Sequence, residues 1–202
     1  APALALPSDE KRSTVSFVTG TDRREMVYQA LKPLEQEIKE GVRGKQVIIK
    51  PNMVGNETPL CATHPDSIRG ALDFLKPFYK DTVLIAESTG RRYNNQSGTF
   101  RHFELYNYPP LVNEYNVKLH DLNADPVRVE WMVGADGRPW DVRIIDTFYD
   151  PKNYIISICR LKTHNAVVVT LSAKNILLGA PVNDGIRHEK ARMHTPGRKL
   201  MN

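Results

Sequence analysis

The sequence predicts an α/β fold with a mainly parallel sheet, flanking helices and one antiparallel hairpin insertion. Three observations predict it. Short apolar runs rich in β-branched residues are typical of strands buried on both faces of a parallel sheet. Segments with helical spacing of apolar residues separate these runs, which favours right-handed crossovers between parallel strands. One pair of alternating segments flanks an Asp-Gly dipeptide, a strong hairpin signal.

The first elements alternate between strand and helix. Residues 14–19 (TVSFVT) are the first predicted strand. Residues 22–40 follow with helical periodicity, which Pro33 interrupts and Gly41 closes. Residues 46–50 (QVIIK) are short and β-branched, so they predict a strand buried on both faces.

A second helix is expected to begin at Pro65. Thr63 or His64 suits its capping position, and apolar residues recur at helical spacing after it. Residues 82–87 (TVLIAE) are the next predicted strand, and the polar, glycine-containing segment 88–98 is predicted to be a loop.

The middle of the chain carries a helix, a strand and the hairpin. Residues 100–115 are predicted to form a helix that breaks at the prolines 109–110. Residues 117–121 are the next strand. Residues 127–133 and 140–145 alternate in hydrophobicity on either side of the Asp-Gly turn, so they predict the antiparallel hairpin.

Residues 154–159 (YIISIC) are another buried-type strand, whereas 167–171 is apolar and fits either a strand or the entrance to a helix.

The chain has 202 residues, 41% of them hydrophobic, which fits one large domain. We expect a flexible N-terminal segment over 1–13 and a single α/β domain over 14–202. No apolar run approaches the roughly 18 residues of a spanning helix, so no membrane span is expected.

The compartment is suggested by the first seven residues, APALALP, which resemble what remains after an export signal is removed. We favour an exported or periplasmic protein, with a cytoplasmic one as the alternative. Cys61 and Cys159 fit one disulfide outside the cell or two buried thiols inside it. An iron–sulfur cluster needs about four thiolates, so this chain alone cannot hold one in the usual way.

Positive charge is concentrated near the C-terminus. The formal net charge is +5. From residue 160 onward only Asp184 and Glu189 oppose the basic residues Arg160, Lys162, Lys174, Arg187, Lys190, Arg192, Arg198 and Lys199. Such an excess favours an anionic ligand, and the alternative is a solvated basic face. His188 and His194 belong to this basic segment and are not assigned catalysis.

Polar residues gather where predicted strands end. Ligands of open parallel sheets bind outside the carboxyl ends of the strands. Lys50 ends one strand, Glu87 ends the next, and the strand 154–159 leads to Lys162, Thr163 and His164. The sequence therefore predicts a ligand site at this edge, which binds a small anionic molecule.

Roles within this site follow from residue type. The catalytic candidates are Lys50, His64, Lys162 and His164, and the ligand-binding candidates are Asn52, Thr63, Glu87, Thr163, Lys174 and Asn175. Lysines would hold the anion, and the two histidines would move protons or bind a single metal ion. Each role has a structural alternative: a salt bridge with Glu87 for Lys50, helix capping for Thr63, and a turn for Asn52.

Four segments also carry a resemblance. They are IIKPNMV (48–54), ATHPDSI (62–68), LKTHNAVVVTLSAKN (161–175) and the following Gly179. In this order the chain resembles the domain-of-unknown-function 362 family over about residues 15–202. Some members of that family carry ferredoxin-like cysteine clusters, which this chain lacks. The family pattern continues past Asn202, so we expect the domain to lack its C-terminal part.

Two functions are compatible with these features. The first is an enzyme or enzyme subunit that acts on a small anionic metabolite. The alternative is a non-catalytic ligand-binding or redox-partner module that docks to an iron–sulfur or other subunit through its basic segment. Nucleic-acid binding is disfavoured because no aromatic residues interleave the basic run. The motifs of serine hydrolases, Walker-type nucleotide binders and Rossmann dehydrogenases are absent from the sequence.

Overall fold

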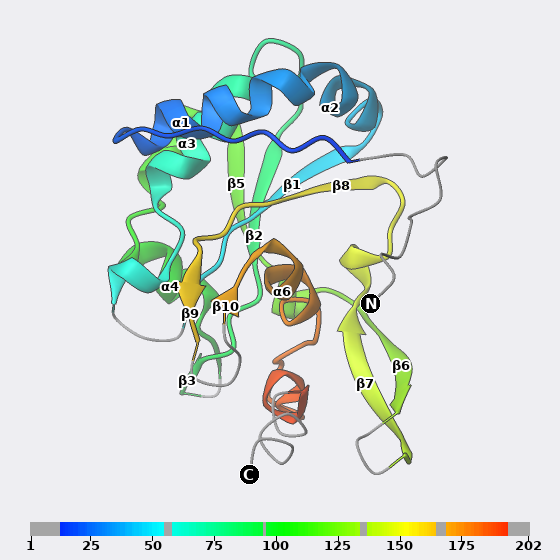
Figure 1. The fold of residues 1–202 in the computed structure, drawn as a ribbon. Coiled ribbons are helices and arrows are strands. Elements are labelled where there is room, and N and C mark those ends of the chain that lie inside the picture. The colour runs from blue at the N-terminus through cyan, green and yellow to red at the C-terminus, as the bar shows by residue number, and fades with distance from the viewer. Residues whose placement is uncertain (1–12, 55–57, 95, 134–136, 165–168, 194–202) are drawn as a thin grey trace, which may run out of the picture.

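A computed structural model describes residues 13–54, 58–94, 96–133, 137–164 and 169–193. Its centre is a four-stranded, all-parallel sheet with the order β5-β2-β1-β8 (Figure 1). The strands are β1 (Gln46–Lys50), β2 (Val83–Glu87), β5 (Val117–Asp121) and β8 (Asn153–Ser157). The predicted α/β fold with a mainly parallel sheet is thus confirmed.

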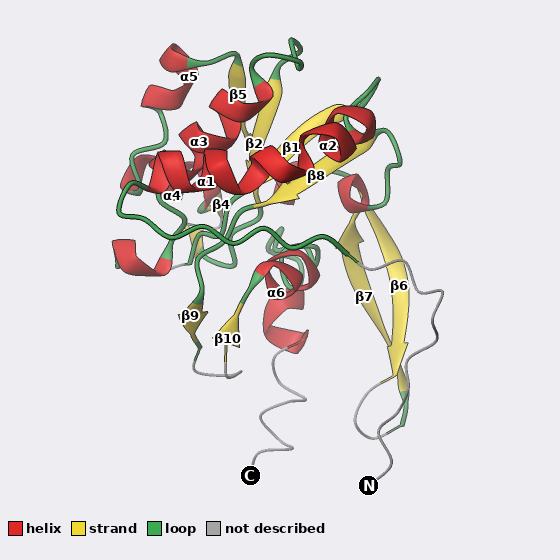
Figure 2. Ribbon diagram, turned by 45° about the horizontal axis from the view of Figure 1, so that its top comes forward, coloured by secondary structure: helices red, strands yellow, loops and turns green. Residues whose placement is uncertain are grey.

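Helices cover one face of this sheet (Figure 2). They are α1 (Arg23–Leu31), η1 (Lys32–Leu34), α2 (Glu35–Gly41) and α3 (Pro65–Leu75). Side chains that alternate along the strands, such as Val47 and Ile49, point into the core beneath them. The helices α1 and α3 cross closely at Gly70, where a Cβ would lie 2.2 Å from the carbonyl oxygen of Arg24. Only glycine therefore permits this packing distance.

The opposite face of the sheet has a smaller core. Ile48 and Ala86 point to this side, because strand residues alternate between faces, and they pack with Ile145 and Val182. Ile145 ends β7 (Pro139–Ile145), which pairs in antiparallel fashion with β6 (Val127–Val133). The hairpin is therefore anchored to the sheet at one end.

The remaining elements are short. They are η2 (Pro59–Cys61), β3 (Arg92–Tyr93), β4 (Gln96–Ser97), α4 (Thr99–Leu105), α5 (Pro110–Glu114), η3 (Leu122–Ala124), η4 (Asp146–Phe148), β9 (Lys162–Thr163), β10 (Val169–Thr170) and α6 (Ser172–Leu177). Residues 189–193 are also helical. Among the described residues, no helix is long and apolar enough to cross a membrane.

Most predicted elements are present. The strands 46–50 and 117–121 and the hairpin strand 127–133 have the predicted bounds. The helix predicted over 22–40 changes to a short 3-10 turn at Pro33 and continues as α2. The helix predicted over 100–115 is broken near its two prolines into α4 and α5.

The strand predicted over residues 14–19 is wrong. Residues 13–20 have no regular secondary structure. Val15 and Phe17 are 85% and 86% exposed. Alternating residues are typical of a half-buried strand, but no described strand pairs with this segment, and the side chains of Val15 and Phe17 face solvent.

Other differences are smaller. The predicted loop 88–98 contains the two-residue strands β3 and β4. In the apolar run 167–171, residues 169–170 form β10, and 167–168 lie outside the described residues. The predicted N-terminal segment 1–13 lies outside them too, except for Ser13.

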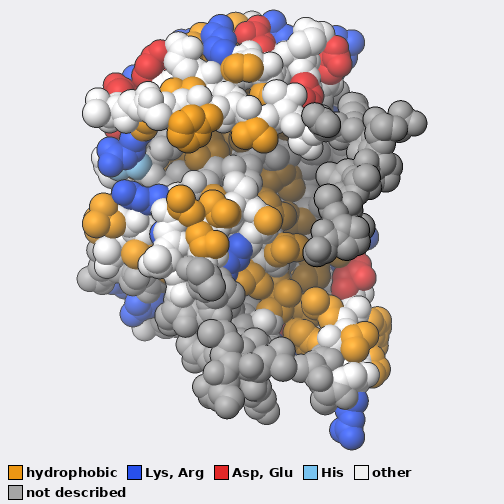
Figure 3. All heavy atoms as spheres, in the orientation of Figure 1, with side chains coloured by type: hydrophobic (Ala, Val, Ile, Leu, Met, Phe, Trp, Pro, Cys, Tyr) orange, Lys and Arg blue, Asp and Glu red, His pale blue; other side chains and the backbone are white. Residues whose placement is uncertain are grey.

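One face of β6 is apolar and exposed. Val127, Val129, Trp131 and Val133 alternate along the strand and so share a face, and Trp131 is 71% exposed. Figure 3 shows hydrophobic side chains gathered over this hairpin. The hairpin therefore presents apolar surface that the described part of the chain does not cover.

Candidate functional site

A buried ion pair stands at the carboxyl edge of the sheet. Lys50 ends β1 and Glu87 ends the neighbouring parallel strand β2, and their side chains are 1% and 3% exposed. The Lys50 Nζ lies 2.7 Å from Glu87 Oε1. The structural alternative for Lys50, a salt bridge with Glu87, is therefore present in the molecule.

The Glu87 carboxylate also fixes two loops. It accepts hydrogen bonds from the backbone N–H of Met53 at 2.8 Å and of Ser88 at 2.7 Å. Three donors thus surround this carboxylate, one of them charged, as a buried carboxylate requires. Glu87 holds together the segments that follow β1 and β2.

Two asparagines extend the network from the ion pair to Lys162. Asn175, on α6, accepts at Oδ1 from Lys50 Nζ and from Asn52 Nδ2, both at 3.1 Å (Figure 1 shows α6 beside the ends of β1 and β8). Asn52 Oδ1 in turn accepts from Lys162 Nζ at 2.6 Å. Burial lowers the pKa of Lys162, and the charge of Lys174 lowers it further.

Lys50, Asn52, Glu87 and Asn175, but not Lys162, border a cleft of about 220 Å³, here called the lysine cleft. Its polar lining consists of Lys50, Asn52, Glu87, Ser88, His164, Lys174, Asn175, His188 and Lys190. Three lysines face one carboxylate, so the lining carries a positive excess that favours anions. Six predicted site residues therefore line one cleft.

Lys174 has the least compensated charge of these lysines. It is half-buried on α6, and burial lowers its pKa. Within the described part of the chain, its ammonium has no hydrogen bond and no ion pair. A desolvated ammonium without a counter-charge gains free energy when an anion binds beside it.

Lys190 was not predicted as a site residue. It lies in the helical segment 189–193, and its Nζ donates to Ser88 Oγ and Leu178 O at 3.1 Å and to Gly179 O at 2.8 Å. Burial, and then the positive charge of Lys50, lowers the pKa of Lys190 to about 7. In the sequence it is one of several basic residues near the C-terminus, and no local pattern marks it.

Gly179, which follows the segment 161–175, lies where the packing leaves no room for a side chain. A Cβ at this position would lie 2.4 Å from Lys50 Cε and 2.4 Å from Asn175 O. Its carbonyl oxygen accepts from Ser88 and Lys190. Glycine here lets the two buried lysines approach the same stretch of backbone.

The two catalytic histidine candidates lie along different clefts. His164 lines the lysine cleft. His64 caps α3, where its Nδ1 accepts from the N–H of Asp66 at 3.2 Å, is 44% exposed, and borders a separate cleft with Cys159. The two imidazoles therefore line different clefts. The described residues contain no group of three or more His, Cys, Asp or Glu side chains placed to hold a metal ion.

Two further candidates also stand outside the lysine cleft. The hydroxyl of Thr63 accepts from the N–H of Asn52 at 2.9 Å and donates to Ile158 O at 2.7 Å, so it fastens the loop after β1 to the segment after β8. Thr163 is exposed on β9, where it pairs with Val169. Thr63 therefore positions Asn52, and Thr163 does not border the cleft.

The cysteines are both free and half-buried in the structure. Cys159 Sγ lies 3.5 Å from Ser172 Oγ, and the carbonyl oxygen of Cys61 accepts from Lys162. Both cysteines act electrostatically on Lys162, and they do not form a disulfide with each other.

Arginines of the basic segment form internal ion pairs. Glu189 is fully buried and lies 3.1 Å from Arg143, 2.8 Å from Arg187 and 2.7 Å from Arg192. Arg143 also pairs with Asp184 at 2.6 Å. This network fastens the segment after α6 to β7, and it pairs Arg187 and Arg192 with carboxylates of the same molecule.

The histidines of this segment were not assigned catalysis. His188 Nδ1 accepts from the N–H of Ala191 at 3.0 Å, and its Nε2 lies 2.8 Å from Gly90 O, so both ring nitrogens have backbone partners. His194 lies outside the described residues.

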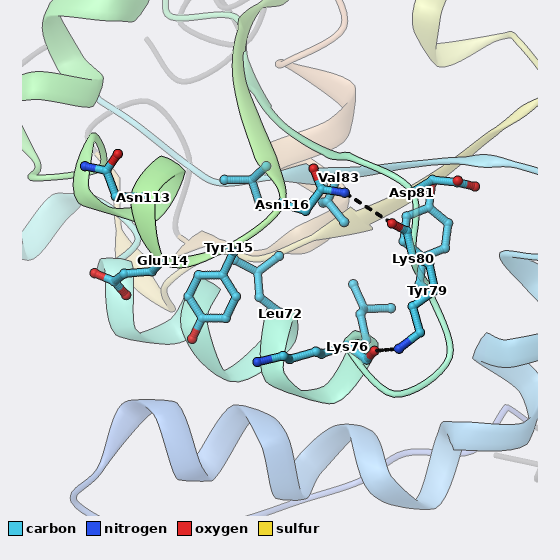
Figure 4. A pocket seen from close by; sticks show the side chains of 12 residues that line it. Leu72, Lys76, Tyr79, Lys80, Asp81, Val83, Asn113, Glu114, Tyr115 and Asn116 are labelled. Carbon is cyan, nitrogen blue, oxygen red and sulfur yellow. Dashed lines mark hydrogen bonds between the residues drawn. The ribbon is translucent and has the colours of Figure 1, made fainter.

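A second hollow of about 340 Å³ lies at the opposite, amino ends of β2 and β5 (Figure 4). Its polar groups bond to one another: Asn116 Nδ2 donates to Lys80 O at 3.1 Å, and Lys80 Nζ donates to Lys76 O at 2.7 Å. Because ligands of parallel sheets bind at the carboxyl ends, we place the candidate site in the lysine cleft instead.

Of the comparisons with known proteins, the one with family models found a match. No curated protein and no solved structure matches the chain. The family model described as "Domain of unknown function (DUF362)" matches residues 47–201, which include β1, β2, β8 and α6. The match spans more than half of the chain and every residue that lines the lysine cleft. The protein therefore belongs to the DUF362 family.

Proposed function

We propose that the lysine cleft binds a small anionic metabolite and that the protein is an enzyme, or an enzyme subunit, that acts on it. The observation that carries the proposal is Lys174, a half-buried cation without a described counter-charge. It lies in the same cleft as Lys50, Lys190 and His164. Carboxylate and phosphate groups supply the oxygen acceptors that an unpaired ammonium needs.

Each lining residue has a distinct part in this proposal. Lys174 contacts the anion directly, and the side-chain amides of Asn52 and Asn175 orient it. Lys50 contributes its charge from a position that Glu87 fixes. Lys162 acts on the cleft through its hydrogen bond to Asn52.

Proton transfer falls to His164, because its imidazole lines the lysine cleft. His64 has no part in this chemistry, since it borders a different cleft. A metal ion shared by the two histidines is therefore not included in the proposal.

The alternative function, a module that docks through its basic segment, has less support. Arg187 and Arg192 are bound to Asp141 and Glu189 within the molecule. Charges that are already paired contribute little to the attraction of an acidic partner. We therefore retain the enzyme as the first candidate.

The test is titration calorimetry with inorganic phosphate and, separately, with pyruvate as a small carboxylate. Lys174→Met should weaken binding by about tenfold or more, the effect of losing one charge-assisted hydrogen bond. Its melting temperature should not fall, because the ammonium has no described partner to lose. Lys118→Met, at an exposed position of β5, is the matched control and should bind as the wild type does.

The proposal fails if the wild type binds neither anion. It also fails if Lys174→Met and Lys118→Met bind equally well.

A further inference from the structure

We propose that the amine of Lys190 forms an imine with the carbonyl carbon of a small oxo acid held in the lysine cleft. The inference rests on the proposed anion binding and names the substrate class: a compact molecule with a ketone or aldehyde group and a carboxylate or phosphate group. Lys190 would then be a catalytic residue, and Lys174 the residue that holds the acid group.

The first argument is position. Lys190 lines the same cleft as Lys174 and His164. Its nitrogen is held between Ser88 Oγ, Leu178 O and Gly179 O at 2.8–3.1 Å, so it has one defined location. A nucleophile that is fixed before the substrate arrives loses little further freedom when it reacts.

The second argument is the charge state. An amine attacks a carbonyl only in its neutral form. Lys190 is almost completely buried beside the positive charge of Lys50, and both effects lower its pKa, to about 7. The carboxylates of Glu87 and Asp121 act in the opposite direction but more weakly. Burial near a second cation is a known way of activating an imine-forming lysine.

The third argument distinguishes the lysines of the cleft. The Lys50 ammonium donates to the Glu87 carboxylate at 2.7 Å, an arrangement that suits a charged group. Lys174 has no described ion pair and is only half-buried, so it suits the binding of an anion. Lys190 donates to the neutral oxygens of Ser88, Leu178 and Gly179, and the positive charge of Lys50 acts on it.

The reaction balances without an oxidant or a reductant. The nitrogen lone pair forms a bond to the carbonyl carbon, and the carbonyl oxygen takes up a proton as the nitrogen loses one. The hydroxyl group of this carbinolamine then leaves as water, with a second proton, while the carbon–nitrogen double bond forms. We assign the transfer of these protons to Ser88 Oγ, 3.1 Å from the nitrogen, and to His164, which lines the same cleft.

The test uses two small aldehydes of similar size. Glyoxylate carries a carboxylate, and glycolaldehyde is uncharged. The full chain is incubated with either aldehyde and sodium cyanoborohydride, which reduces an imine to a stable secondary amine, and each modified lysine is located by peptide mass spectrometry. Exposed Lys118 serves as the internal reference. The proteins compared are the wild type, Lys190→Arg and Lys174→Met.

We expect glyoxylate to modify Lys190 at least about tenfold faster than Lys118 at pH 7.5, because the cleft concentrates the anion and the amine is partly neutral. Glycolaldehyde should show a much smaller preference. Inorganic phosphate should protect Lys190 and leave Lys118 unprotected. Lys174→Met should reduce the modification of Lys190 by glyoxylate.

Two different failures are distinguishable. If calorimetry shows that phosphate binds at Lys174, yet glyoxylate modifies Lys190 no faster than Lys118, the imine is refuted and anion binding stands. If neither phosphate nor pyruvate binds and phosphate does not protect Lys190, the anion-binding function itself is refuted. Circular dichroism of Lys190→Arg and Lys174→Met shows whether each variant is folded before its labelling is compared.

Discussion

The buried pair of Lys50 and Glu87 gives the sharpest prediction of stability. Removing one partner of a buried ion pair leaves an uncompensated charge and costs about 3–5 kcal/mol. Glu87→Gln is expected near the upper end of that range. The Lys50 ammonium would then retain only neutral partners, such as Asn175 Oδ1 and Pro51 O, at 3.1 Å.

Lys50→Met is expected near the lower end. The Glu87 carboxylate would keep its two backbone donors, the N–H groups of Met53 and Ser88, which partly compensate its charge. The double variant Lys50→Met, Glu87→Gln has no buried charge at either position. Its loss should be smaller than the sum of the single losses by about 1–3 kcal/mol.

Urea denaturation followed by circular dichroism measures these changes. With a slope of about 2 kcal/mol per molar urea, a loss of about 3–5 kcal/mol lowers the midpoint by about 1.5–2.5 M. The slope itself should not change. Single losses below about 1 kcal/mol, the size seen for exposed pairs, would refute the reasoning, as would losses that add in the double variant.

Two further predictions concern the same cleft. Because the pKa of Lys190 is about 7 when folded and near the ordinary lysine value of about 10.4 when unfolded, the unfolded chain binds more protons between these values. The free energy of unfolding should therefore rise with pH across that window, by at most about 1.4 kcal/mol per unit. Urea titrations at pH 7, 8 and 9 check this, and Lys190→Met should flatten the dependence; an unchanged slope would contradict the assignment. Gly179→Ala places a methyl group 2.4 Å from Lys50 Cε and Asn175 O, and it should cost about 1–3 kcal/mol and weaken phosphate binding. Wild-type stability and phosphate affinity in this variant would show that the close contact is relieved without consequence.

The sheet and one part of the site could be predicted because they follow from local rules. Lys50 and Glu87 end two β-branched runs, and neighbouring parallel strands end at the same edge. Their contact therefore follows from topology alone. Asn175 also reaches this edge. It lies on α6, which begins shortly after the short strand β10, and β10 follows β8 in the chain.

Other features depend on packing that no local pattern encodes. The segment 14–19 has the alternation of a strand, but alternation does not say whether a partner strand is present. His64 and His164 follow the ends of parallel strands, yet they border different clefts, because α3 packs beneath α1 on one face of the sheet. Sharing an edge of the sheet does not mean sharing a pocket.

Lys190 shows the same limit most clearly. It directly follows Glu189 in the chain. Glu189 forms ion pairs with Arg143, Arg187 and Arg192, and these pairs hold this segment in place. Two of these arginines come from the same basic segment, and the third comes from β7. In the sequence Arg187 and Arg192 count as excess positive charge, and only the folded chain shows that they bind the residue next to a buried lysine of the cleft.

The lysine cleft also has a consequence for the order in which the protein acquires its properties during synthesis. The contact of Lys50 with Glu87 joins residues 37 positions apart, whereas its contact with Asn175 spans 125 positions and that of Ser88 with Lys190 spans 102. A nascent chain can pair β1, β2 and β5 long before the ribosome has released α6. Closing such long loops is slow, so the cleft is expected to be among the last parts to form. Until then Lys190 is an ordinary solvated amine, and any unusual reactivity at this position begins only when folding is complete.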